Sequence, residues 1–165
     1  MSRCSDGFIY ALEPTPECWN LALKHRTQIV HDLDASIVNF YLDLKPGSVV
    51  VESGTGSGAM SVGLCRALAP TGHLYTFEFN ESRANIAREE FGVLGLSSLV
   101  TVTHRDVCGK DGQGGGFADI VGYEAADAVF LDLPEPWLAV KHAKDVLKPG
   151  KALCSYSPCM EQVMK

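Results

Sequence analysis

The chain lacks several patterns that would assign it to a broad class of protein. Its N-terminus has no basic stretch followed by an apolar run, so no secretory signal is predicted, and no apolar run approaches membrane-spanning length. The six cysteines form no Cys-x-x-Cys pair, which argues against zinc and predicts reduced thiols in an intracellular protein. Acidic residues outnumber basic ones, and the formal net charge is −6. An acidic chain binds a polyanion poorly, so a nucleic-acid substrate would require a basic partner or further segments.

The size and composition are those of one globular domain, with 165 residues of which 46% are hydrophobic. From residue 48 onward, short apolar runs alternate with segments of helical character, which predicts an α/β fold with a parallel sheet and flanking helices. The expected strands are Ser48–Glu52, His73–Glu78, Leu99–His104, Ala128–Asp132 and Ala152–Tyr156. The expected helices between them are Ala59–Leu68, Glu81–Leu94 and Pro136–Leu147.

The segments outside this alternation are less regular. Gly7–Leu12 is predicted to be a strand, Thr15 the N-cap of a short helix, and Asp34 the N-cap of a second helix. Residues 107–127 exceed a minimal crossover and contain a glycine-rich run, so we interpret them as a mobile surface insertion. Only two residues follow the helical segment Ser157–Val163, which predicts a shortened chain whose last strand is a sheet edge.

The run Val49–Gly58, Val-Val-Val-Glu-Ser-Gly-Thr-Gly-Ser-Gly, is the most informative part of the sequence. Three β-branched residues before a carboxylate indicate a buried strand. The alternating glycines predict a turn whose backbone N–H groups can approach a ligand, although an ordinary tight turn is the alternative. Their spacing differs from the dinucleotide fingerprint, and a carboxylate at the strand end suits an ammonium or sulfonium group. Glu78 ends the next expected strand, where nucleotide-binding α/β units place an acceptor for ribose hydroxyls.

A second informative run, Asp132-Leu133-Pro134-Glu135-Pro136-Trp137, follows the fourth expected strand. Ligands of open parallel sheets bind beyond the carboxyl ends of the strands, so its aspartate is expected to share a crevice with Glu52, Gly54 and Glu78. The prolines predict a rigid loop, and a carboxylate beside an aromatic face suits a planar base with an amino group. In the alternative interpretation, the second proline begins the next helix and the tryptophan is a core side chain.

Four segments resemble the catalytic subunit of the tRNA (adenine-N1)-methyltransferases that modify adenosine 58 in the T-loop. They are His25–Val30, Glu52–Gly58, Asp132–Trp137 and Ser155–Gln162. The resemblance implies a Rossmann-like class I fold and methyl transfer from S-adenosylmethionine to N1 of adenine in tRNA. It also implies a homologous non-catalytic RNA-binding subunit, a heterotetramer with two copies of each subunit, no metal, and a nuclear location.

The resemblance further implies roles for individual residues, with Asp132 as the catalytic aspartate. The residues implied at the cofactor are Gln28, Ile29, Glu52, Ser53, Gly54, Thr55, Gly56, Ser57, Gly58, Glu78, Arg83, Asp106, Val107 and Asp132. The residues implied at the tRNA are Gly7, Phe8, His31, Pro134, Trp137, Ser155, Tyr156, Ser157, Pro158, Cys159 and Gln162.

The chemistry of the reaction agrees with these residue types. N1 of adenine has an in-plane lone pair and needs no base to attack the sulfonium methyl group. Methylation makes the ring cationic, so a carboxylate at the exocyclic amine would stabilise the developing charge. Alignment of N1 with the methyl group would supply much of the remaining rate enhancement. Because N1 lies on the Watson–Crick edge, the base must leave its stack.

The sequence departs from the family pattern in two respects. His31 stands where the family has a tyrosine in the target-base pocket, and a neutral imidazole stacks less broadly. The family also has an N-terminal β-domain and further C-terminal strands. Residues 1–33 are therefore predicted to be a remnant of that domain with its linker, and residues 34–165 a methyltransferase core without its final strands.

Three alternatives remain open at the level of sequence. The chain could be a shortened, non-catalytic form that binds cofactor or a partner subunit. It could be a class I methyltransferase that acts on another substrate, such as a protein carboxylate or another base. An NAD-binding oxidoreductase is the third, and the glycine spacing disfavours it.

Overall fold

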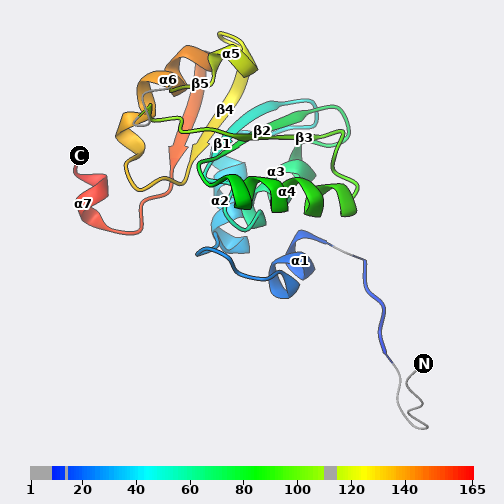
Figure 1. Cartoon of the computed structure of the whole chain (residues 1–165). Helices are drawn as coiled ribbons and strands as arrows, with labels where there is room; N and C mark the ends of the chain where they lie inside the picture. Colours follow the sequence, from blue (N-terminus) through cyan, green and yellow to red (C-terminus); the bar gives the residue numbers. More distant parts are fainter. Residues whose placement is uncertain (1–8, 14, 110–114) are drawn as a thin grey trace.

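The fold is built on one parallel sheet (Figure 1), and the computed structural model describes residues 9–13, 15–109 and 115–165. The strands are β1 (Val49–Ser53), β2 (His73–Glu78), β3 (Val100–His104), β4 (Ala126–Leu131) and β5 (Leu147–Ser155). They lie in the order β3-β2-β1-β4-β5, and every pairing is parallel. The predicted α/β class and all five predicted strands are confirmed, although β5 begins earlier than expected.

Helices cover both faces of this sheet (Figure 1). They are α1 (Pro16–Ala22), α2 (Asp32–Tyr41), α3 (Ala59–Leu68), α4 (Glu81–Val93), α5 (Ala118–Val121), the 3-10 helix η1 (Pro136–Leu138), α6 (Val140–Val146) and α7 (Met160–Val163). Side chains of α2, α3 and α4 pack on one face, and those of α5 and α6 pack on the other. Within the described ranges, no helix combines the length and apolar character needed to cross a bilayer.

Strand β1 belongs to both cores because successive side chains of a strand point to opposite faces. Val50 packs with the residues of α2, α3 and α4, whereas Val51 packs with those of α6 and with Phe117. Both valines are fully buried, and each buried valine stabilises the fold by roughly 1.5–3 kcal/mol relative to an exposed one. The strand is therefore held firmly from two sides, and its carboxyl end presents the glycine turn from a rigid support.

Of the two N-cap residues predicted before residue 48, one is confirmed and the other is wrong. The N-cap at Thr15 is confirmed, because its side chain accepts a hydrogen bond from the backbone N–H of Cys18 at 3.3 Å. The N-cap at Asp34 is wrong: the N-cap of α2 is His31, three positions earlier, and the helix begins at Asp32. Asp34 lies in the first turn, where a negative charge complements the helix dipole.

The N-terminal segment also differs from expectation. Residues 9–12 carry no strand, and the rest of the predicted strand, Gly7 and Phe8, lies outside the described residues.

The segment predicted to be a mobile surface insertion is partly built into the core. Phe117 is fully buried, and its ring lies edge-on to that of Phe77, with 5.0 Å between the centroids. The backbone N–H of Gly116 donates to the carbonyl of Val107 at 2.9 Å. A surface interpretation is therefore wrong for this part of the segment, while residues 110–114 lie outside the described residues.

One carboxylate joins three strands at the amino end of the sheet. Asp127 accepts hydrogen bonds from the backbone N–H of Val49 at 3.0 Å and from Nζ of Lys148 at 2.9 Å. Nζ of Lys151 lies 3.7 Å from the same side chain. These contacts connect the first residues of β1, β4 and β5, at the end of the sheet opposite to the cavity described next.

Candidate active site

A cavity of about 650 Å³ opens at the carboxyl ends of the strands, within the usual size range of small-molecule sites. The predicted site residues that line it are Gln28, Ile29, Ser53, Gly54, Gly56, Glu78, Arg83, Asp106, Val107, Asp132, Pro134, Tyr156, Pro158 and Gln162. They come from six separate stretches of the chain, and the parallel sheet brings these stretches to one edge.

The other predicted site residues lie elsewhere. Those that form the turn or the strand end without lining the cavity are Glu52, Thr55, Ser57 and Gly58. Those outside the lining toward the tRNA side are His31, Trp137, Ser155, Ser157 and Cys159. Gly7 and Phe8 belong to the residues that are not described.

The glycine turn permits close packing that no side chain would allow. At Gly54, whose φ is +99°, an added Cβ would lie well inside 3.0 Å of the carbonyl oxygen of Asp132. At Gly56, whose φ is +54°, it would lie 2.6 Å from Oγ1 of Thr27. Both φ values fall where only glycine is unstrained. The turn therefore brings three distant parts of the chain together along the cavity.

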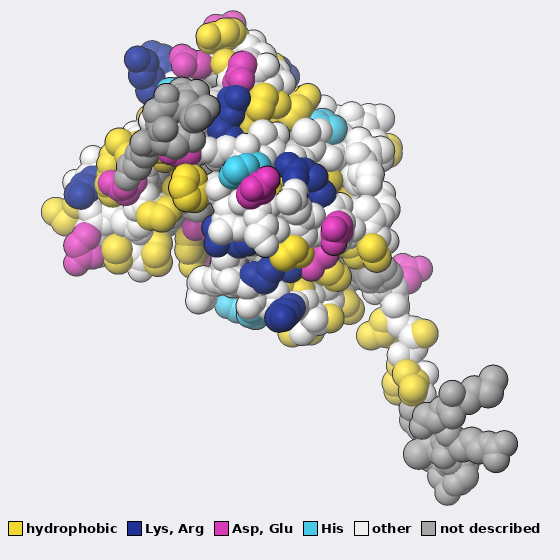
Figure 2. Space-filling view, in the orientation of Figure 1, with side chains coloured by type: hydrophobic (Ala, Val, Ile, Leu, Met, Phe, Trp, Pro, Cys, Tyr) yellow, Lys and Arg dark blue, Asp and Glu magenta, His cyan; other side chains and the backbone are white. Residues whose placement is uncertain are grey.

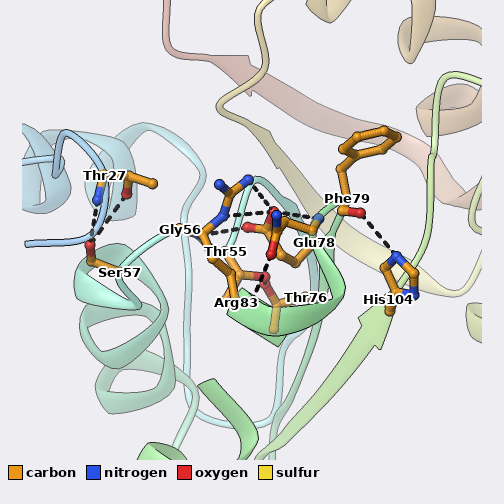
Figure 3. Close-up of polar contacts among 10 residues, drawn as sticks. Thr27, Thr55, Gly56, Ser57, Thr76, Glu78, Phe79, Arg83 and His104 are labelled. Carbon is orange, nitrogen blue, oxygen red and sulfur yellow. Dashed lines mark hydrogen bonds and ion pairs between the residues drawn. The ribbon is translucent and has the colours of Figure 1, made fainter. Parts of the chain in front are cut away.

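Glu78 fixes the far side of this turn (Figure 3). Its side chain is 4% exposed, and Oε2 accepts the backbone N–H of Gly56 at 2.9 Å. Oε1 accepts the N–H of Asn80 at 2.9 Å and Nη2 of Arg83 at 2.6 Å. Oε1 also accepts Nε of Arg83 at 3.1 Å, whereas the bond from Gly56 uses one of the two acceptor positions of Oε2, so Oε2 can still accept a ligand hydroxyl. Arg83, predicted at the cofactor, thus also orients the carboxylate that would bind it.

Glu52 lies beneath the cavity, fully buried. Oγ of Ser61 donates to its Oε2 at 2.6 Å, which ties the end of β1 to the first turn of α3. Burial raises the pKa of Glu52 to about 7, against the opposite effect of the Ser61 hydrogen bond. Its carboxyl group is therefore close to half protonated near neutral pH.

Asp132 lies directly after β4 and lines the cavity. Its backbone N–H donates to the carbonyl of Ser53 at 2.9 Å, which continues the pairing of β1 with β4. Burial raises the pKa of Asp132 to about 6, so its carboxyl group is mainly ionised at neutral pH. An anion held in a partly buried cavity suits a ligand or transition state with positive charge.

The C-terminal segment closes the same side of the cavity. The backbone N–H of Tyr156 donates to the carbonyl of Leu131 at 2.8 Å, and Nε2 of Gln162 donates to the carbonyl of Pro134 at 2.9 Å. Two of the four family-like segments, Asp132–Trp137 and Ser155–Gln162, thereby meet around the catalytic candidate.

Two residues predicted near the target base lie outside this grouping. Trp137 is partly buried within η1, and Nζ of Lys165 lies 4.7 Å from the centroid of its ring. The second proline of that run begins η1, as the alternative interpretation of the sequence expects. His31 is exposed as the N-cap of α2.

Several residues of the cavity were not predicted from the sequence. They are Thr27, Phe77, Phe79, Arg105, Cys108, Leu133 and Glu135. The most informative is Phe79, which is 66% exposed and whose carbonyl accepts a hydrogen bond from Nε2 of His104 at 2.9 Å (Figure 3). An aromatic residue directly after a strand-terminal carboxylate could have been recognised as a possible stacking surface.

The chemistry of the lining favours an organic ligand. Carboxylates, backbone N–H groups and aromatic rings meet at the cavity, and in the described part of the chain no cluster of three or more His, Cys, Asp or Glu residues could hold a metal ion. The arrangement can accept hydroxyl groups at Glu78, a planar group at Phe79 and a cationic or amino group at Asp132.

Comparison with known proteins identifies the family. The family model described as the tRNA methyltransferase complex GCD14 subunit matches residues 7–165. The tRNA (adenine(58)-N(1))-methyltransferase catalytic subunit of Dictyostelium discoideum is 51% identical over 158 residues, which cover 96% of this chain and 49% of that protein. The subunit of the same name from Yarrowia lipolytica is 44% identical, with 99% of this chain and 41% of that protein covered. The chain spans about half the length of the curated relatives that it matches.

Solved structures agree in fold. A SAM-dependent O-methyltransferase from Thermotoga maritima matches with a TM-score of 0.80 and 33% identity, covering 93% of this chain and 54% of that chain. The tRNA (m1A58) methyltransferase TrmI from Aquifex aeolicus matches with a TM-score of 0.77 and 25% identity, covering 92% and 57%. The family resemblance and the Rossmann-like methyltransferase fold predicted from the sequence are confirmed.

Proposed function

The chain belongs to the family of the tRNA methyltransferase complex GCD14 subunit, and from this we propose that it transfers a methyl group from S-adenosylmethionine to N1 of adenosine 58 in the tRNA T-loop. Relatives named as the catalytic subunit for adenine 58 match over nearly the whole chain. The observation that carries the proposal is the Asp132 side chain, which lines the cavity beside the glycine turn. An acidic group there is what methylation of an amino-bearing base requires.

The cavity fits S-adenosylmethionine in volume and in chemistry. A Cβ at Gly54 or Gly56 would occupy space beside the turn, and its absence leaves the backbone open to a ligand. The residues that would hold the cofactor are Gln28, Ile29, Ser53, Gly54, Gly56, Glu78, Phe79, Asp106 and Val107. Glu52, Thr55, Ser57 and Gly58 would support the turn from behind. When bound, the cofactor supplies an electrophilic methyl group on a sulfonium.

Asp132 would act on the target base. Its carboxylate, ionised above a pKa of about 6, would accept an N–H from the exocyclic amine of adenine. This contact stabilises the positive charge that methylation gives to the ring. No base is needed to remove a proton, because the lone pair of N1 lies in the ring plane. Tyr156, on the cavity wall, would help to orient the extruded base.

Binding of tRNA would depend on a second subunit. The chain carries a net charge of −6, and on the face in Figure 2 Lys and Arg side chains are interspersed with Asp and Glu. Such a surface attracts phosphates weakly. The proposal therefore includes a homologous, non-catalytic RNA-binding subunit, in a heterotetramer with two copies of each. The segments Gly7–Phe8 and Ser155–Gln162 would contact the tRNA, and a nuclear location stays a prediction.

The test is the variant Asp132→Ala, assembled with the partner subunit and supplied with tRNA and labelled S-adenosylmethionine. We expect methyl transfer to fall by at least about a thousandfold, while calorimetry with S-adenosylhomocysteine detects binding close to that of the wild type. Unchanged turnover in Asp132→Ala would contradict the catalytic role. Cofactor binding without any turnover in the wild-type complex would favour the non-catalytic alternative.

A further inference from the structure

The segment between α1 and α2, residues 23–31, crosses the glycine turn and supplies one wall of the cavity. Thr27, Gln28 and Ile29 line this wall, and Ile29 is buried against Leu23 and Ala59. The segment has no regular secondary structure of its own from residue 24 to residue 30. Its position over the cavity must therefore come from contacts with its neighbours.

The hydroxyl of Ser57 provides the first of these contacts. Oγ accepts two consecutive backbone N–H groups, from Arg26 at 2.9 Å and from Thr27 at 3.1 Å (the Thr27 contact is drawn in Figure 3). Oγ1 of Thr27 lies 3.3 Å from the same atom. Ser57 is 3% exposed and does not line the cavity. Although it belongs to the glycine motif, its hydroxyl binds the crossing segment and not the ligand.

The guanidinium of Arg26 provides the second contact. Its Nη1 donates to Oε1 of Glu90 in α4 at 2.7 Å, and its Nη2 donates to Oε2 at 2.8 Å. Nη2 also donates to the carbonyl of Ser57 at 3.3 Å. The two side chains are 15% and 29% exposed. A bidentate, charge-assisted pair that is largely shielded from water is stronger and more specific than an exposed pair. Arg26 thus connects the crossing segment, the glycine turn and α4.

From these contacts we propose that Arg26, Ser57 and Glu90 form a latch that positions Gln28 and Ile29 for cofactor binding. The inference rests on the proposed function, because it concerns the same cavity. The latch residues do not touch the ligand and act through the segment that they hold. Releasing the segment lowers cofactor affinity, because part of the binding free energy is then used to order residues 23–31. Once the cofactor is bound, Asp132 is in place and the transfer step is unaffected.

The first experiment compares Arg26→Ala, Glu90→Ala and the double variant with Arg66→Ala. Arg66 is a matched control, because it joins α3 to α1 through Glu17 at 3.1 Å, yet both side chains are more than half exposed. We expect each latch variant to raise the Kd of S-adenosylhomocysteine by about tenfold, and the double variant to raise it no further. Methyl transfer at saturating cofactor should change less than about twofold. Arg66→Ala should change neither quantity.

Hydrogen exchange gives a second readout that does not need a ligand. In Ser57→Ala, the amides of Arg26 and Thr27 lose their acceptor and should exchange faster, and Kd should rise by about fivefold or more. Thermal melting checks that each variant is folded. If Arg26→Ala does not fold, Arg26→Lys takes its place. Because a lysine cannot form the bidentate pair, this variant should still bind more weakly than the wild type.

The outcomes separate the latch from the proposed function. If the wild type binds S-adenosylhomocysteine and the folded latch variants bind it equally tightly, the latch proposal is overturned and the proposed function is not. Additive effects of Arg26→Ala and Glu90→Ala on Kd would also overturn it. A wild-type protein that does not bind S-adenosylhomocysteine at all would overturn the proposed function, and the positioning role with it.

Discussion

The backbone carbonyl of Asp132 occupies the space in which a side chain of Gly54 would have to lie. The two residues follow neighbouring parallel strands, β1 and β4, whose last paired residues are Ser53 and Leu131. The turn that would hold the cofactor is thus packed directly on the residue that would act on the base. A side chain at residue 54 would therefore displace the backbone of Asp132.

Gly54→Ala tests this contact. The substitution adds a Cβ at a φ of +99° and against a carbonyl oxygen, so we expect a loss of about 3 kcal/mol of unfolding free energy or more. Gly63→Ala is the control, because Gly63 lies inside α3 with no atom within 4 Å of an added Cβ. It should stabilise the protein by about 0.5–1 kcal/mol. Urea unfolding of both variants measures the difference, and similar midpoints for the two would refute the packing argument.

The pH dependence of methyl transfer should report Asp132. Because burial raises its pKa to about 6, the carboxyl group is neutral below that pH and anionic above it. We expect kcat/KM to rise about tenfold per pH unit below 6 and to level off above it. Asp132→Asn, which cannot ionise, should have low activity without this rising limb. A wild-type profile that is flat from pH 5 to pH 8 would argue against an ionised carboxylate at the base.

Glu52 should make the protein less stable as pH rises. The native state raises its pKa from 4.5 to about 7, so it binds more protons than the unfolded state between these values. Unfolding free energy therefore falls across that window, by on the order of 3 kcal/mol. Glu52→Gln keeps an acceptor for Ser61 and should remove this part of the slope. Chemical unfolding at pH 5 and pH 8 gives the comparison, and an equal slope in both proteins would disprove the assignment.

Phe79 should contribute to cofactor affinity and little to stability. Its ring is 66% exposed at the edge of the cavity, so removing it costs few core contacts. Stacking on a planar base is worth about 1 kcal/mol, so Phe79→Ala should raise the Kd of S-adenosylhomocysteine about fivefold. Tyr123→Ala, at a similarly exposed aromatic away from the cavity, should leave Kd unchanged. Equal affinities for the Phe79 variant and the wild type would show that the ring does not stack.

The positions of the strands, and of the carboxylates at their carboxyl ends, could be predicted from the sequence. A strand of a parallel sheet is buried on both faces, so it is a short apolar run that ends near the first charged residue. Glu78 and Asp132 both end such runs, and a parallel sheet brings the carboxyl ends of its strands to one edge. The same reasoning does not show that Glu52 is fully buried and outside the cavity lining. Gly54 and Gly56, which follow it in the same motif, do line the cavity.

What remained hidden depends on contacts between distant residues. The hydroxyl of Ser57 is bonded to backbone groups that lie 31 and 30 residues earlier in the chain. The glycines before Phe117 predict a surface insertion, yet its ring packs against that of Phe77 in β2. No local pattern specifies such pairs, since each depends on how the crossing segment and the long connection lie over the finished sheet.

The carboxylate that joins three strands at the amino end of the sheet has a consequence for inherited or engineered variation. Asp127 and its partners Val49 and Lys148 are a sheet's length away from Asp132. Substitutions around Asp127 should reduce how much protein is folded, and a tightly bound ligand can offset that loss by mass action. Replacement of the Asp132 side chain, which lines the cavity, should leave the amount of folded protein intact and remove its activity. The two ends of one sheet thus define two classes of loss-of-function variant, of which only the first can be rescued by cofactor supply or lower temperature.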